Sequence, residues 1–201
     1  MRWLVVCCTL ALTACSITPT EPIDQERAQA AWLSRQTALK QITHWRLDGR
    51  IAISQGEDFY AVNLRWRQKH ADFNIDISGP MGSGHFKLKG VQHGDVYLRD
   101  SDQNNYHAQN PETLVYQHTG MHIPVNGLFY WVRGLPDPSL PQQQVAELDQ
   151  QGHLQKLVQD GWTVEFSDYA DFVEHQLPEK LVIQHDDIEI KLIVHRWQLR
   201  S

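Results

Sequence analysis

Residues 45–77, WRLDGRIAISQGEDFYAVNLRWRQKHADFNIDI, decide the fold because apolar and polar side chains alternate along most of their length. A period of two is typical of strands that bury one face only. The same period returns downstream at Phe86 and Leu88 and at Val96 and Leu98. Successive strands joined by short turns predict an antiparallel meander. Its apolar positions begin with Leu47, Gly49, Ile51, Ile53, Val62, Leu64, Trp66, Phe73, Ile75 and Ile77.

Helical patterns flank and interrupt this sheet. Residues 24–42 contain no Pro or Gly and predict one amphipathic helix. Asn110, Pro111 and Gly120 have the order of an N-cap, a first helical residue and a C-terminal stop, and residues 124–134 repeat this scheme. Strands are expected again over residues 145–148, 154–158, 162–166, 181–183 and 188–197. The apolar face of so large a sheet must be covered or closed into a barrel, and periodicity leaves open whether the interior is packed or hollow.

The first residues, MRWLVVCCTLALTACS, have the order of a bacterial lipoprotein signal. Arg2 precedes a short apolar run, small residues lead to Cys15, and a polar stretch follows. The run is shorter than the ~20 residues that a spanning helix needs. We therefore expect residues 1–14 to be a signal peptide, residues 15–23 an acylated N-terminus with a tether, and residues 24–201 one domain. Ser16 in place of Asp predicts sorting to the outer membrane.

Composition excludes several classes of function. The formal net charge is −6 and the basic residues are scattered, which disfavours a nucleic-acid partner. All three cysteines lie within the first 15 residues, so the domain has no disulfide framework and no cysteine metal site. His118 and His122 have helical metal-ligand spacing, but Gly120 interrupts them. No nucleophile motif or paired carboxylates stand out, so we expect neither an enzyme nor a metal or other cofactor.

A glycine-rich turn carries an apolar residue at its centre. In SGPMGSGHF, residues 78–86, Met81 stands between Gly79-Pro80 and Gly82, and strand patterns flank the segment. Met81 is therefore predicted at a hairpin tip in water. A single exposed apolar residue is ordinary in soluble proteins, so the residues alone leave its role open.

The lipoprotein signal, the helix and meander, GPMGS and TGMHIPVNGLFYWVRGLP (residues 119–136) together resemble the LolB family. The resemblance covers essentially the whole chain and implies a mainly β fold: an incompletely closed antiparallel β-barrel with a helical lid over an apolar cavity. It implies an outer-membrane receptor that takes acylated lipoproteins from the periplasmic carrier LolA and inserts them into the inner leaflet of the outer membrane. A monomer is expected.

The resemblance also assigns roles to residues. It places Met81, with Gly79, Pro80 and Gly82, in a loop that enters the membrane, where the family usually has Leu. Cavity candidates are Leu64, Trp66, Ile75, Phe86, Leu128, Trp131 and Trp162, each of which core packing would also explain. The alternative function is a structural or assembly lipoprotein of the outer membrane with a packed barrel and no lipid binding.

Overall fold

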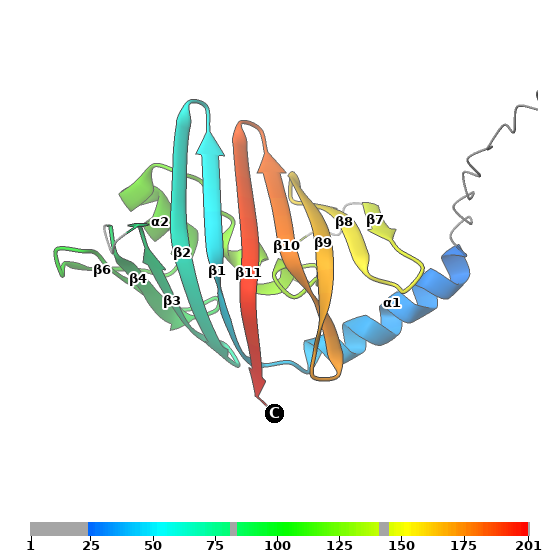
Figure 1. Ribbon diagram of the computed structural model, residues 1–201. Helices are drawn as coiled ribbons and strands as arrows, with labels where there is room; N and C mark the ends of the chain where they lie inside the picture. Colours follow the sequence, from blue (N-terminus) through cyan, green and yellow to red (C-terminus); the bar gives the residue numbers. More distant parts are fainter. Residues whose placement is uncertain (1–23, 81–83, 141–144, 201) are drawn as a thin grey trace, which may run out of the picture.

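The computed structural model describes residues 24–80, 84–140 and 145–200. Its one sheet has eleven antiparallel strands in the order β6-β5-β4-β3-β2-β1-β11-β10-β9-β8-β7. The sheet curves around one side of the molecule and does not close, because β6 and β7 lie at its two edges (Figure 1). The strands are β1 His44–Gln55, β2 Asp58–Lys69, β3 Asp72–Ser78, β4 Phe86–Val91, β5 Val96–Arg99, β6 Asn105–Ala108, β7 Val145–Leu148, β8 Leu154–Gln159, β9 Trp162–Phe172, β10 His175–His185 and β11 Ile188–Arg200.

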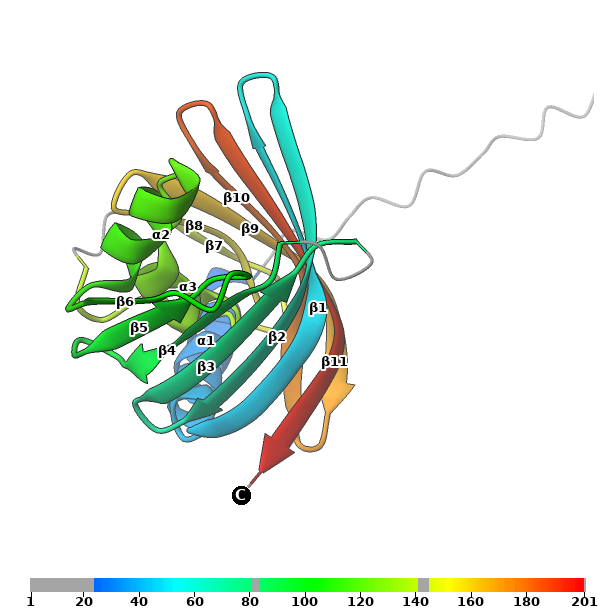
Figure 2. The ribbon, with the colours of Figure 1, turned by 90° about the vertical axis from the view of Figure 1, so that its left-hand side faces the viewer.

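Within the described ranges, three helices accompany the sheet: α1 Gln25–Lys40, α2 Pro111–Thr119 and α3 Val125–Trp131. The helices lie on the concave side, with α2 and α3 over the half formed by β1–β6 (Figure 2). The ends of α2 are set as expected, whereas α3 begins after Pro124 and ends at Trp131, before the predicted stop at Gly134. Asp24 caps α1 by accepting from Arg27 N, and Asn110 caps α2 by accepting from Glu112 N. Gly120, with φ +71°, ends α2 in the left-handed conformation. The predicted fold, an open antiparallel barrel with a helical lid, is confirmed.

The two halves of the sheet meet at a pairing that is not between neighbours in sequence. β1 pairs with β11 over almost their full lengths, and every other pair in the sheet joins consecutive strands. The register shifts between Asp48 and Gly49, where His195 is the extra residue of β11. Such a bulge bends the strand that carries it, and here it lies at the centre of the curved sheet.

The core lies between the concave face and the helices. Its fully buried members include Leu47, Trp131, Leu177 and Ile190, which come from both halves of the sheet and from α3. Among the described residues, the buried core runs from Ala28 to Trp197. Within the described ranges no helix is long and apolar enough to cross a membrane.

One strand was not predicted. β6, Asn105–Ala108, is short, with only Tyr106 and Ala108 packed against the core, and it pairs with the edge of β5. The later strands are also longer than their apolar patterns, since β9 continues to Phe172 and β10 begins at His175. The added parts still contact the core, since Leu177 is fully buried and Phe172 packs against the core cluster. They were missed because polar pairs, Ser167-Asp168 and Glu179-Lys180, interrupt the apolar alternation.

Candidate functional site

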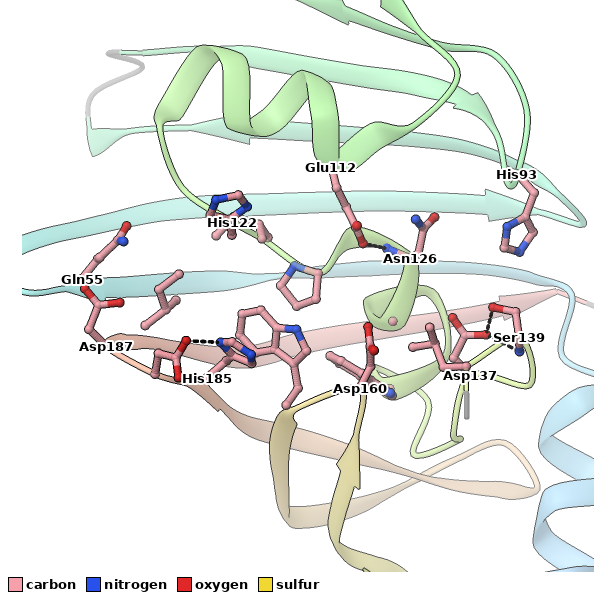
Figure 3. A pocket seen from close by; sticks show the side chains of 18 residues that line it. Gln55, His93, Glu112, His122, Asn126, Asp137, Ser139, Asp160, His185 and Asp187 are labelled. Carbon is pink, nitrogen blue, oxygen red and sulfur yellow. Dashed lines mark hydrogen bonds and ion pairs between the residues drawn. The ribbon is translucent and has the colours of Figure 1, made fainter. Parts of the chain in front are cut away.

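A cavity of about 490 Å³ opens at the mouth of the half-barrel. Figure 3 shows its side chains arriving from the β1–β2 turn, the β10–β11 turn, α2, α3 and the segment after α3. Trp162, Ile123, Leu140 and Ile188 supply apolar surface, and the fully buried Trp131 forms part of the wall behind them. The polar lining contains five carboxylates and no Lys or Arg: Gln55, Glu112, Asn126, Asp137, Ser139, Asp160, Asp186, Asp187 and the histidines at 93, 122 and 185.

Glu112 links the two lid helices. Its carboxylate Oε1 accepts from the backbone N of Asn126 at 3.1 Å, so the start of α2 is joined to the start of α3. Burial raises the pKa of the Glu112 carboxyl, and the hydrogen bond from Asn126 opposes part of that rise. The link holds α2 and α3 together as one cover beside the cavity.

Aromatic rings fill the space beneath α3. Phe129 meets Trp66 at 5.1 Å and Phe73 at 4.9 Å between ring centroids, and Trp45 meets Trp66 at 5.2 Å. These spacings are those of packed aromatic pairs. The interior directly under α3 is therefore solid, and the open space lies at the mouth.

A buried amide fastens α3 to the second half of the sheet. Gln159, at the end of β8, accepts from Trp131 Nε1 at 3.0 Å and from the backbone N of Asp137 at 2.9 Å. Its Nε2 donates to the carbonyl oxygen of Asp137 at 2.8 Å. Gln159, Trp131 and Asp137 have no exposed surface. One side chain thus satisfies three polar groups that have no access to water.

A buried cation fastens α3 to the end of α1. Arg133 donates to the carbonyl oxygens of Ile42 at 3.0 Å, Phe129 at 3.2 Å and Leu39 at 3.4 Å. Burial lowers the pKa of its guanidinium to about 10, so the group remains charged at neutral pH. The Leu39 carbonyl oxygen also accepts from the backbone N of Ile42 at 3.2 Å, so Arg133 adds a tertiary bond to the local bonds that end α1.

A half-exposed apolar surface continues from the core toward the tips of the long hairpins. The β1–β2 and β10–β11 hairpins extend beyond the lid helices (Figures 1 and 2). On the concave face of β1 and β2, Ile51 pairs with Val62 and Ile53 pairs with Tyr60. Tyr60 is 46% exposed and the other three are partly buried. Ile77 on β3 and Phe86 on β4 form the next pair across the sheet. We call these six residues the rim strip.

The predicted cavity residues fall into three groups. Trp131 and Trp162 line the mouth cavity. Phe86 belongs to the rim strip, where it pairs with Ile77. Leu64, Trp66, Ile75 and Leu128 lie in the buried core, and Leu64 also reaches the base of a hollow on the convex face. The structure thus brings the two tryptophans together at the mouth and separates them from the other candidates.

Several predicted residues fall outside or at the border of the described ranges. Cys15, Met81 and Gly82 lie outside the described residues. Gly79 is buried at the end of β3, and Pro80 is exposed. The two histidines considered as metal ligands have aromatic neighbours: His118 packs on Tyr106 and His122 stacks on Tyr116. Among the described residues, no group of three His, Cys, Asp or Glu side chains has a metal-binding arrangement.

Sequence reasoning missed the polar groups of the mouth and the residues that fasten the lid. Gln159 and Arg133 lie at strand and helix ends, where polar residues are common, so no pattern distinguished them. A signal did exist for the rim strip. The alternation at Ile51 and Ile53 continues further along β1 than a lid of two short helices can cover.

Comparisons with known proteins agree over nearly the whole chain. The family model described as outer membrane lipoprotein LolB matches residues 43–197. A protein of Ectopseudomonas mendocina named outer-membrane lipoprotein LolB is 33% identical over 203 residues, covering 100% of this chain and 98% of that protein. The Pseudomonas aeruginosa protein of the same name is 32% identical with the same coverage.

A solved structure has a similar fold. The crystal structure of a DUF1329 family protein from Desulfovibrio piger has a TM-score of 0.52 and 8% sequence identity, and the alignment covers 90% of this chain and 95% of that one. At this identity the likeness concerns the fold alone.

Proposed function

The chain belongs to the LolB family of outer-membrane lipoproteins, and from this we propose that it accepts acylated lipoproteins from the carrier LolA and inserts them into the outer membrane. Its role as an outer-membrane lipoprotein receptor follows from the family. The acceptance step, the insertion step and the acylation of Cys15 are our proposals. With residues 1–14 removed and residues 15–23 as tether, the domain 24–201 would face the periplasm.

The rim strip is the observation that carries the proposal. It is apolar, concave, partly open to solvent and continuous with the core. An acyl chain laid along it would remove apolar surface from water at roughly 25 cal/mol per Å². The polar mouth beside it suits the end of a lipoprotein where acyl chains join a peptide. We propose that acyl chains lie along the rim strip and that Trp131 and Trp162 border their polar ends.

The transfer that we propose needs no chemical step. An acyl chain moves from carrier to receptor to bilayer if each successive apolar environment binds it more favourably. A lipid anchor at Cys15 would keep the receptor at the acceptor membrane, since two or more acyl chains anchor stably where a single chain does not.

An acyl-probe titration tests the proposal. A fluorescent fatty acid titrated into residues 24–201 should bind saturably, and Ile53→Asp should weaken binding by at least tenfold, because burial of one Ile contributes about 1.5–3 kcal/mol. Ile193→Asp is the matched control, since Ile193 is 47% exposed on the convex face of β11. Absence of saturable binding in the parent would favour a structural lipoprotein with no lipid binding. Equal affinity of Ile53→Asp and the parent would place the acyl chain elsewhere.

The loop that contains Met81 supplies a second test, of delivery. We propose that Met81 enters the leaflet. Met81→Glu should then accept lipoprotein from the carrier normally and release it into liposomes at least tenfold more slowly, because a charge opposes insertion into lipid. Met81→Leu should behave as the parent, since the two side chains are apolar and similar in volume. Delivery by Met81→Glu at the parent's rate would show that the loop only closes a hairpin.

A further inference from the structure

The convex face of the sheet carries a cluster of cations in a chain whose net charge is −6. Strand register aligns Asp48, Arg65, Asp76 and Lys87 in one row across β1, β2, β3 and β4. Arg46 and Arg67 lie opposite each other in the next row. We call these six residues the convex patch. They surround a hollow of about 480 Å³, to which all but Arg46 contribute.

Each carboxylate in the convex patch is shared by two cations. Asp48 is 3.0 Å from Arg46 Nη2 and 3.1 Å from Arg65 Nε. Asp76 is 3.5 Å from Arg67 Nη2 and 3.1 Å from Lys87 Nζ. Each group of three therefore keeps one net positive charge. Each aspartate holds its two cations side by side and offsets only one of their two charges.

The cations are also the outermost part of the convex patch. The side chains of Arg65 and Arg67 are 56% and 53% exposed, whereas those of Asp48 and Asp76 are 24% and 15% exposed. A partner that approaches this face meets guanidinium groups first. These groups are planar donors that match the geometry of phosphate oxygens. Figures 1 and 2 show no helix over this face of β1–β4 among the described residues.

The convex patch lies at the base of the loop between β3 and β4. Asp76 and Lys87 pair across these strands, and Ile77 and Phe86 form the last pair before the loop. One to two residues of strand separate the patch from the loop, which is about 7 Å or less at 3.3 Å per residue. A loop dipped into a leaflet would bring the patch to the depth of the phosphate groups.

We propose that the convex patch binds the phosphate groups of anionic phospholipids and so sets the orientation of the domain on the membrane. This rests on the proposed function, because it takes the membrane as the place where the receptor releases its cargo. The overall negative charge and the acidic mouth would repel an anionic surface. Attraction limited to the convex face therefore favours one orientation, with this face and the adjacent loop against the lipid.

Vesicle flotation of residues 24–201 tests the proposal. Binding to phosphatidylethanolamine vesicles should increase when phosphatidylglycerol is added and should decrease with salt. Arg65→Glu/Arg67→Glu should weaken binding to the anionic vesicles by about 30-fold or more, since each basic residue near such a surface contributes about 1 kcal/mol. Lys156→Glu/Lys180→Glu on β8 and β10 makes the same change in net charge and should leave most of the binding intact.

Three outcomes would overturn the proposal. The first is equal binding to vesicles with and without phosphatidylglycerol. The second is binding of Arg65→Glu/Arg67→Glu to anionic vesicles with the parent's affinity. The third is an equal loss of vesicle binding in Lys156→Glu/Lys180→Glu, which would show that net charge alone controls binding. Circular dichroism checks folding, and Arg65→Gln/Arg67→Gln replaces the Glu variant if that one misfolds. Acyl-probe binding is read separately. If the acyl probe binds normally but vesicle binding does not depend on phosphatidylglycerol, only the proposed role of the convex patch is rejected. If vesicle binding depends on phosphatidylglycerol but the acyl probe does not bind, only the proposed function is rejected.

Discussion

Replacing Gly49 with Ala should lower the free energy of unfolding by about 3 kcal/mol or more. A Cβ atom at Gly49 points directly at the carbonyl oxygen of Ile193 on the neighbouring strand. Backbone atoms cannot turn aside as a side chain can, so β11 must move away from β1. Among the strands that the structure describes, this pairing alone joins the two halves of the sheet. Urea denaturation of residues 24–201 measures the effect.

Gly56→Ala is the matched control for this change. Gly56 lies in the turn that follows β1, with φ +56° and nothing within 4 Å of an added Cβ. Only the left-handed backbone conformation opposes Ala there, at a cost of roughly 1–2 kcal/mol. A loss in Gly49→Ala no larger than that in Gly56→Ala would mean that the β1–β11 pairing adjusts freely. The bulge would then not fix the curvature of the sheet.

Replacing Gln159 with Leu should lower the free energy of unfolding by about 2–5 kcal/mol. The substitution leaves Trp131 Nε1 and the backbone N of Asp137 buried without an acceptor. A buried donor without a partner costs about 1–3 kcal/mol. The carbonyl oxygen of Asp137 loses its donor as well. Because these bonds hold α3 against β8, near-UV circular dichroism of the tryptophans should change before the strands unfold.

Gln184→Leu controls for the loss of an amide. Gln184 is exposed on β10 and donates to Glu189 Oε2 at 2.8 Å, where water can replace it. Its substitution should stay within about 0.5 kcal/mol. If Gln159→Leu is equally mild, water enters beside Trp131 and satisfies the freed groups. The lid would then be held by apolar packing alone.

Much of the fold was predictable because strand formation here follows side-chain alternation. The meander of β1–β5, the interruption by α2 and α3, and the later strands each have a local pattern or a cap in the sequence. The fold class was confirmed, and family membership followed from residues 119–136 together with the signal. β6 was missed because Asn105–Ala108 has only two inward-facing residues, too few to give a pattern, and it forms by pairing with the edge of β5.

The candidate site was less predictable because it depends on contacts between distant parts of the chain. Alternation identifies which side chains point inward, and it cannot tell a packed interior from an open one. Trp66 falls at an inward position of a strand pattern and Trp131 at an inward position of a helix pattern. Yet Trp66 packs between Trp45 and Phe129, while Trp131 borders the mouth cavity. That difference depends on where α3 lies over the sheet. The position of α3 in turn depends on two side chains. Gln159 on β8 accepts a hydrogen bond from Trp131 of α3, and Arg133, just after α3, donates to the carbonyl oxygen of Ile42 after α1.

The sequence by itself determined the local structure: strand faces, helix ends, the glycine turns and the predicted lipid signal, all of which depend on neighbouring residues. Only the tertiary structure decided the pairing of β1 with β11, the solid core under α3, the open rim strip beyond it and the convex patch. Each of these joins residues far apart in the chain. Such contacts form when the whole sheet curves and its register is set, and no local pattern records which distant strand will be the partner.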